Sequence, residues 1–235
     1  VECSDVLFFQ SSLRNNSFIQ LTALRRLKIE YCKIGEVPRD AFAGLSNLQN
    51  LTLKTYNTDW SAMTLTIAKN AFMYLHKIEH LELGDNNIWT LPSRLFCDLD
   101  RLSFLNLSRN KLQNINDLSF SRVIGRCAPR LRELDLSLNH FSCVPPSAFA
   151  ALKNLTSLNI SLNGIQKIED QAFFGMYSLK VLDISGNLLG TLPPELFKEN
   201  KRLTELYARN NSIAVLAPGL FTGLNMLMKL NLANN

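Results

Sequence analysis

The chain has 235 residues, of which 46% are hydrophobic and 19% are charged, and its formal net charge is +5. This composition is typical of an ordered globular protein with a sizeable core, and it excludes a disordered chain. No apolar run reaches the roughly 18 to 20 residues that cross a bilayer. Lys and Arg are spread along the chain, which argues against a dedicated nucleic-acid groove and favours no nucleic-acid partner.

Residues 1–23 precede the first regular unit, and we expect them to form an N-terminal cap or a first partial coil. Glu2 and Asp5 lie where a secretory leader would be basic and then apolar, so no leader is expected at Val1. Cys3 lies in this segment and could approach Cys32, but the sequence leaves this pairing open.

Residues 24–235 consist of units in which leucine-type residues recur with a period of 24. The units begin at Leu24, Leu48, Ile78, Leu102, Leu131, Leu155, Leu179 and Leu203, and a truncated one begins at Leu227. They follow L-x-x-L-x-L-x-x-N-x-L or a close variant of it, with a Phe about eight residues later in the complete units. The length and the pattern match the leucine-rich repeat. The predicted fold class is therefore α/β, a leucine-rich repeat solenoid of about eight complete turns.

The spacing within a unit predicts the geometry of the coil. The segment x-L-x-L-x has period 2, so it predicts a short strand whose two leucines point inward. One unit cannot bury its apolar side alone, but stacked units form a continuous core. Because strands stack more closely than the bulkier segments on the opposite side of each unit, the stack is expected to curve into a horseshoe. We expect a parallel sheet on its concave face and an irregular or short helical convex side.

The ninth position of most units is asparagine. This residue turns the chain, and its amide can satisfy backbone groups that would otherwise be buried without a partner. We expect a structural asparagine ladder made of Asn86, Asn110, Asn139, Asn163, Asn187 and Asn211, with Asn235 in the last, unfinished unit. Cys32 occupies the same position in the first unit. Because no cap follows Asn235, we expect the chain to be part of a longer protein.

The unit that begins at Leu48 breaks the period, because it has 30 residues and contains TYNTDWSAM. Tyr56 replaces the ladder asparagine there. One interpretation is a protruding recognition loop with Trp60 as its aromatic anchor and Tyr56 and Asp59 as further candidate partner contacts. The other interpretation is that Trp60 folds back over the gap left by the missing asparagine. The second is favoured, because an exposed Trp is uncommon without a partner.

Two cysteines fall in neighbouring units. Cys97 follows Phe96, and Cys127 lies in the corresponding part of the next unit, within an insertion that runs from Asp117 to Pro129. Adjacent coils would place the two within bridging range, so we predict a Cys97–Cys127 disulfide. Cys143 is left over, and we expect a partly buried thiol. Disulfide bonding favours an oxidising, secreted environment.

Six N-glycosylation sequons exceed the roughly three that chance predicts for this composition. They are Asn15, Asn50, Asn106, Asn154, Asn159 and Asn210. Asn106 and Asn159 occupy the fifth position of their units, in the middle of the predicted sheet. Sugars there would exclude a protein partner, so we expect partners to use the early coils, a side edge or the convex face.

The sequence contains no pattern that favours catalysis. It has no G-x-S-x-G, no phosphate-binding glycine loop and no paired-cysteine zinc motif. We therefore expect no catalytic residues, no metal and no cofactor apart from N-linked glycans, and no enzymatic activity.

The irregular units carry a family resemblance. The stretches IEYCKIGEVPRDAFAGLSNLQNLTLKTYNTDWSAM, GDNNIWTLPSRLFCDLDRLSFLNLSRNKL and NDLSFSRVIGRC resemble arthropod Toll receptors of the long, Tollo-like branch. The resemblance covers nearly the whole chain. It implies the extracellular side of a plasma-membrane receptor in innate immune or developmental signalling, anchored through parts that this chain does not contain.

The resemblance also implies the kind of partner. It implies a protein ligand such as a Spätzle-like cystine-knot cytokine or another cell-surface receptor, and it allows a homo- or heterodimer. The alternative is a secreted or cell-surface leucine-rich repeat adhesion protein without transmembrane signalling. A membrane span and a Toll-type signalling domain after Asn235 would decide between the two.

Overall fold

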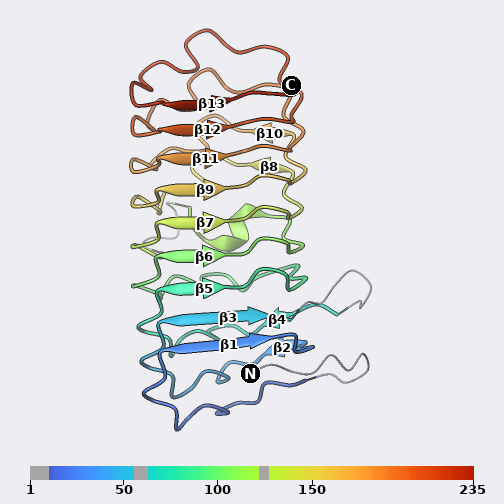
Figure 1. Ribbon diagram of the computed structural model, residues 1–235, viewed down its shortest axis with the longest axis vertical. Coiled ribbons are helices and arrows are strands. Elements are labelled where there is room, and N and C mark those ends of the chain that lie inside the picture. Colours follow the sequence, from blue (N-terminus) through green and yellow to red (C-terminus); the bar gives the residue numbers. More distant parts are fainter. Residues whose placement is uncertain (1–10, 56–62, 122–126) are drawn as a thin grey trace.

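The computed structural model describes residues 11–55, 63–121 and 127–235. Within these residues, nine parallel strands form one sheet along one side of the molecule (Figure 1). In sheet order they are β1 (Arg26–Glu30), β3 (Asn50–Lys54), β5 (His80–Glu82), β6 (Phe104–Asn106), β7 (Glu133–Asp135), β9 (Ser157–Asn159), β11 (Val181–Asp183), β12 (Glu205–Tyr207) and β13 (Lys229–Asn231). Each strand comes from one predicted unit, so the predicted solenoid is confirmed.

The register of the strands stacks equivalent leucines in one interior row. Leu134, Leu158 and Leu182 are aligned in neighbouring strands, and at most 2% of each is exposed. Leu230 holds the same position in β13, but 44% of it is exposed because β13 is the edge strand of the described sheet. Each coil thus buries the apolar side of its neighbour, as expected for a stack in which no unit has a core of its own.

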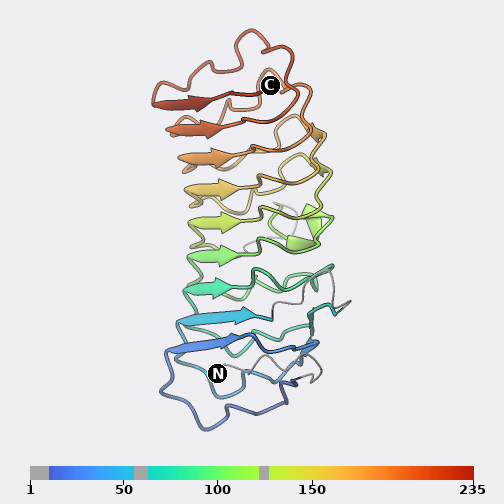
Figure 2. The same ribbon diagram turned by 45° about the vertical axis from the view of Figure 1, so that its right-hand side comes forward.

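The opposite side of the stack has little regular structure (Figure 2). Two small parallel pairs lie in the return segments, β2 (Glu36–Val37) with β4 (Thr66–Ile67), and β8 (Cys143–Val144) with β10 (Lys167–Ile168). Among the described residues there is one 3-10 helix, η1 (Ile115–Leu118), which overlaps the start of the insertion in the unit that begins at Leu102. The expected irregular or short helical side is therefore mostly irregular within the described residues.

Phenylalanines fill the core behind the return segments. In one row each ring stacks on the ring of the next unit, with centroids 6.0 to 6.4 Å apart, and the row consists of Phe18, Phe42, Phe72, Phe96 and Phe120. Phe173 stacks on Phe197 in the same way, with a centroid distance of 6.3 Å. Offset stacking at these distances stabilises each contact beyond the area that it buries. The repeated Phe is therefore the second structural row of the solenoid.

The segment before β1 packs on the first full coil. Ser11 pairs with Ile34 in an isolated parallel bridge, and the Phe18 ring stacks on Phe42. Gly44 has φ +90°, and a Cβ atom there would lie 2.4 Å from the carbonyl oxygen of Ile19. Only glycine allows this close approach of the two backbones.

Candidate ligand-binding surface

The outward side chains of the nine-stranded sheet form a polar surface, which we call the sheet face. The fifth position of each unit forms its central row, aligned across all nine strands. The row consists of Lys28, Thr52, Glu82, Asn106, Asp135, Asn159, Asp183, Tyr207 and Asn231. This row is the surface that a partner would meet in the middle of the sheet.

Several members of the central row also close the turn that follows their strand. The Oδ1 atoms of Asn106, Asp135, Asn159 and Asp183 accept hydrogen bonds of 2.8 to 3.0 Å from the backbone N–H groups of Ser108, Ser137, Ser161 and Ser185, respectively. Such side-chain contacts two residues along the chain mimic a backbone turn. From the sequence alone, these residues are exposed groups, and Asn106 and Asn159 are also sequons. The recurring pattern Asx-x-Ser was the available signal for their second role.

The six sequons lie on several sides of the solenoid. Asn15, Asn154 and Asn210 are exposed, whereas Asn50, Asn106 and Asn159 are partly exposed and lie within β3, β6 and β9. The Nδ2 atom of Asn106, which a glycan would modify, donates to Glu82 at 3.0 Å. Modification at the two central positions stays a prediction.

The asparagine ladder connects successive coils through backbone groups. For example, Nδ2 of Asn187 donates to the carbonyl of Ile160 at 3.1 Å, and its Oδ1 accepts from the N–H groups of Asn163 and Ile165. The same donor and acceptor roles occur at Asn110, Asn139, Asn163, Asn211 and Asn235. These backbone N–H and carbonyl groups lie in the coil interior, where the ladder asparagines are their partners. The ladder therefore stabilises the coils next to the sheet face.

Asn86 extends the ladder over the coil that lacks an asparagine. Its Nδ2 donates to the carbonyl of Leu53 at 2.7 Å, and its Oδ1 accepts from both the N–H and the hydroxyl of Thr55. Thr55 is only 2% exposed. Tyr56, Asp59 and Trp60 lie outside the described residues, so both interpretations of that loop remain predictions.

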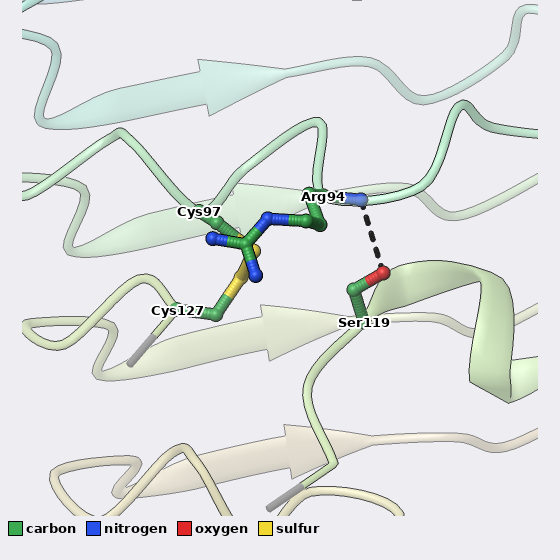
Figure 3. The surroundings of a disulfide bond; sticks show 4 residues. All are labelled: Arg94, Cys97, Ser119 and Cys127. Carbon is green, nitrogen blue, oxygen red and sulfur yellow. Dashed lines mark hydrogen bonds between the residues drawn. A yellow bond between two sulfur atoms is a disulfide. The ribbon is translucent and has the colours of Figure 1, made fainter. Parts of the chain in front are cut away.

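A disulfide joins Cys97 and Cys127, the pair for which the sequence predicts a bond, and both side chains are buried. Next to it, Ser119 has φ +61° at the end of η1, and its hydroxyl accepts a 3.0 Å hydrogen bond from the backbone N–H of Arg94 (Figure 3). These contacts attach the insertion to the preceding coil on both sides of residues 122–126.

The other cysteines differ from each other. Cys32 is buried and disulfide-bonded, while Cys3 lies outside the described residues. The expectation of a partly buried Cys143 is wrong, because this thiol is free and exposed. Cys143 and Val144 form β8, and successive strand residues point to opposite sides. Val144 points into the core, so Cys143 points to solvent.

A charged cluster lies on the sheet face at β12 and β13. The Tyr207 hydroxyl donates to the Glu205 carboxylate, and Lys229 Nζ lies 3.0 Å from the same carboxylate. The hydrogen bond from Tyr207, and after it that from Lys229, lowers the pKa of Glu205. The hydrogen bond to Glu205 raises the pKa of Tyr207 and of Lys229.

This cluster predicts an acid-dependent loss of stability. Because the folded-state pKa of Glu205 is lowered, its contribution is present above the ordinary glutamate value of about 4.3 and is lost as pH falls through the lower folded value. As the pH is lowered from about 5 to about 3, the thermal midpoint of the Glu205→Gln variant should therefore decrease less than that of the parent protein. Asp100→Asn, which removes another exposed carboxylate, is the control. Parallel pH profiles of parent and Glu205→Gln would contradict the prediction.

The described residues contain no group of three or more His, Cys, Asp or Glu side chains that could hold a metal ion. No helix within residues 11–55, 63–121 and 127–235 has the length and hydropathy of a membrane span.

A family model described as "Leucine rich repeat" matches residues 63–112, 129–189, 153–213 and 177–235, which together make up more than half of the chain. The chain therefore belongs to the leucine-rich repeat family. Within this class it is related to the Toll-like receptors. It is 32% identical over 185 residues to Toll-like receptor 7 of Drosophila melanogaster, a match that covers 76% of this chain and 13% of that protein.

Solved structures have the same fold. A Toll–Spätzle complex from Drosophila matches 94% of this chain and 28% of its own with a TM-score of 0.76 and 24% identity. A TLR13–ssRNA13 complex matches 94% of this chain and 34% of its own with a TM-score of 0.71 and 25% identity. The chain thus spans between 13% and 34% of the length of these proteins.

Proposed function

We propose that this chain is an extracellular ligand-recognition part of a Toll-type transmembrane receptor of the arthropod long-Toll branch. The observation that carries the proposal is the 32% identity to the fly Toll-like receptor 7 across 76% of the chain. The buried disulfide supports an oxidising location. In this role the chain is not an enzyme, and it contributes to innate immune or developmental signalling at the plasma membrane.

The proposed ligand is a protein, such as a Spätzle-like cystine-knot cytokine. The similar Toll structure is a complex with Spätzle, which supports this class of ligand. The similar TLR13 structure is a complex with single-stranded RNA, so RNA is the competing class of ligand. Binding through the surface of a rigid solenoid needs no cofactor, because complementarity of shape and charge provides the specificity.

We propose further that the ligand does not dock over the middle of the sheet face. Asn106 and Asn159 are partly exposed there, and sugars on their amides would project over β6 and β9. Docking would then use the early coils, a side edge or the opposite side of the stack.

The experiment measures binding of the secreted 235-residue protein to a Spätzle-type cytokine by surface plasmon resonance, with single-stranded RNA as the competitor. We expect cytokine binding that RNA does not displace. Ser157→Arg adds a long cation at the first position of β9, beside the central row of the sheet face, and should change the cytokine affinity by less than about twofold. A tenfold loss would show that the ligand covers the centre. No cytokine binding, together with homophilic association, would favour the adhesion alternative.

A further inference from the structure

An open groove of about 890 Å³ runs along the side of the sheet where the strands begin. In Figure 1 this is the left side, because the strand arrows point to the right. The groove extends from the start of β5 to the segment before β12. Its lining residues lie at the first strand positions or just before them, so equivalent positions of successive coils build it.

The groove is strongly basic. Five exposed cations line it, namely Arg101, Arg130, Arg132, Lys180 and Arg202. Only two carboxylates, Glu79 and Glu133, line it as well, which leaves an excess of three positive charges. Although Lys and Arg are spread along the sequence, the coil period brings these five to one side of the molecule.

The five cations form no salt bridge with any described residue. By contrast, Lys54, Lys167, Lys198 and Lys229 are each within 4 Å of a carboxylate. Unpaired cations that lie close together repel one another, and binding of an anion removes this repulsion. The five cations are therefore available to a partner from outside the chain.

The spacing of the cations indicates a linear partner. Arg101 and Arg202 are separated by four coil steps, which corresponds to about 19 Å at the usual distance between neighbouring strands. Arg130, Arg132 and Lys180 lie between them. Their order follows the long axis of the solenoid, so a polymer with anionic groups along its length would contact the cations one after another.

The remaining lining residues identify the class of polymer. Serine, threonine and asparagine side chains alternate with the cations, and Phe104 is the single apolar side chain in the lining. The Phe104 ring stacks on His80 with a centroid distance of 5.8 Å. Single-stranded nucleic acids stack their bases on a series of aromatic side chains, and this groove offers only the His80–Phe104 pair. Arginine clusters also recognise acidic peptides, but the polar side chains between the cations favour a polymer that carries hydroxyl groups along its length.

We propose that this basic groove binds a sulfated glycosaminoglycan of the heparan sulfate type. The sulfates would contact the five cations, and the sugar hydroxyls would form hydrogen bonds with the serine, threonine and asparagine side chains between them. The proposal assumes the extracellular location proposed above but not the receptor role. Failure to bind the polysaccharide would therefore leave the cytokine experiment unaffected.

The sequon Asn154 also lines the groove, where its Nδ2 donates to the carbonyl of Pro129 at 2.8 Å. A sugar on this exposed residue would project into the space that the polysaccharide occupies. The measurements are therefore made both on the native chain and on an Asn154→Gln background, in which the groove stays free of N-linked sugar.

The test uses the secreted 235-residue protein and immobilised heparan sulfate, with affinity measured by surface plasmon resonance at several NaCl concentrations. Binding should weaken steeply with salt, because the bound cations displace counterions from the polymer. The double variant Arg130→Ala/Arg132→Ala should lose about 30-fold in affinity, since each cation beside an anionic surface contributes about fivefold. Single-stranded RNA and poly-glutamate are measured in parallel.

The matched control is Lys167→Ala/Lys198→Ala, which removes the same charge from residues outside the groove. It should change the affinity for heparan sulfate by less than twofold. The proposal is overturned if the control variant loses as much affinity as the groove variant. It is also overturned if the Asn154→Gln protein does not bind heparan sulfate at about physiological salt, or if RNA or poly-glutamate binds the groove more tightly than heparan sulfate does.

Discussion

Replacing both Cys97 and Cys127 with alanine is expected to lower the free energy of unfolding by about 3–4 kcal/mol. The two residues are separated by 30 positions, and the bond removes the corresponding loop entropy from the unfolded chain. It also attaches the insertion to the preceding coil, where both side chains are buried. Urea unfolding followed by circular dichroism measures the difference.

The control for the disulfide is Cys143→Ala. This thiol is free and exposed, so its removal should change the free energy of unfolding by less than about 0.5 kcal/mol. Reduction of the parent protein also breaks the disulfide of Cys32, so it should lower the stability at least as much as the double variant does. If the parent and the double variant unfold at the same urea concentration, the bond does not stabilise the solenoid.

Asn187→Ala is expected to lower the free energy of unfolding by about 2–4 kcal/mol. The Asn187 side chain is 4% exposed, and its amide accepts from the N–H groups of Asn163 and Ile165 while donating to the carbonyls of Ile160 and Ile184. Alanine leaves the N–H groups of Asn163 and Ile165 without partners, whereas the carbonyls of Ile160 and Ile184 still accept from Asn163 and Asn211, respectively. Each such buried group costs about 1–3 kcal/mol, and small shifts that admit water reduce the sum.

The effect of Asn187→Ala is measured by urea unfolding against Asn225→Ala. Asn225 is exposed, and its replacement should change the free energy by less than about 0.5 kcal/mol. An additional expectation concerns cooperativity. Because each coil contacts only its neighbours, a loss at one junction should broaden the transition as well as shift it. Equal stability of the two variants would show that water satisfies the backbone groups.

The solenoid was predictable because its signal is local and repeated. The 24-residue period, the paired leucines and the ninth-position asparagine recur in successive units, and the structure aligns Leu134, Leu158 and Leu182 as this pattern requires. The Cys97–Cys127 bond was predictable for the same reason, because the coil period places equivalent positions side by side. Cys143 was misjudged, because the return segments follow no such strict pattern, and a two-residue strand turns this thiol outward.

The sequons show how a sequence motif can have a structural origin. Asn106-Leu-Ser108 and Asn159-Ile-Ser161 have the same form as Asp135-Leu-Ser137 and Asp183-Ile-Ser185, which cannot be glycosylated. In all four, the first residue accepts a hydrogen bond from the backbone N–H of the serine. Turn closure alone therefore accounts for an asparagine or aspartate at the first of these positions. Part of the excess of sequons over chance reflects the repeat.

By itself, the sequence determined the coil, the number of units and the residues that face the interior, because each of these depends on periodic spacing along the chain. Only the tertiary structure decided which distant residues share a surface. Arg101 and Arg202 are far apart in a chain with dispersed charge, yet stacking places them in one basic groove. The physical reason is that a solenoid converts equal positions in successive units into neighbours in space, so its charge pattern is visible only when the coils are stacked.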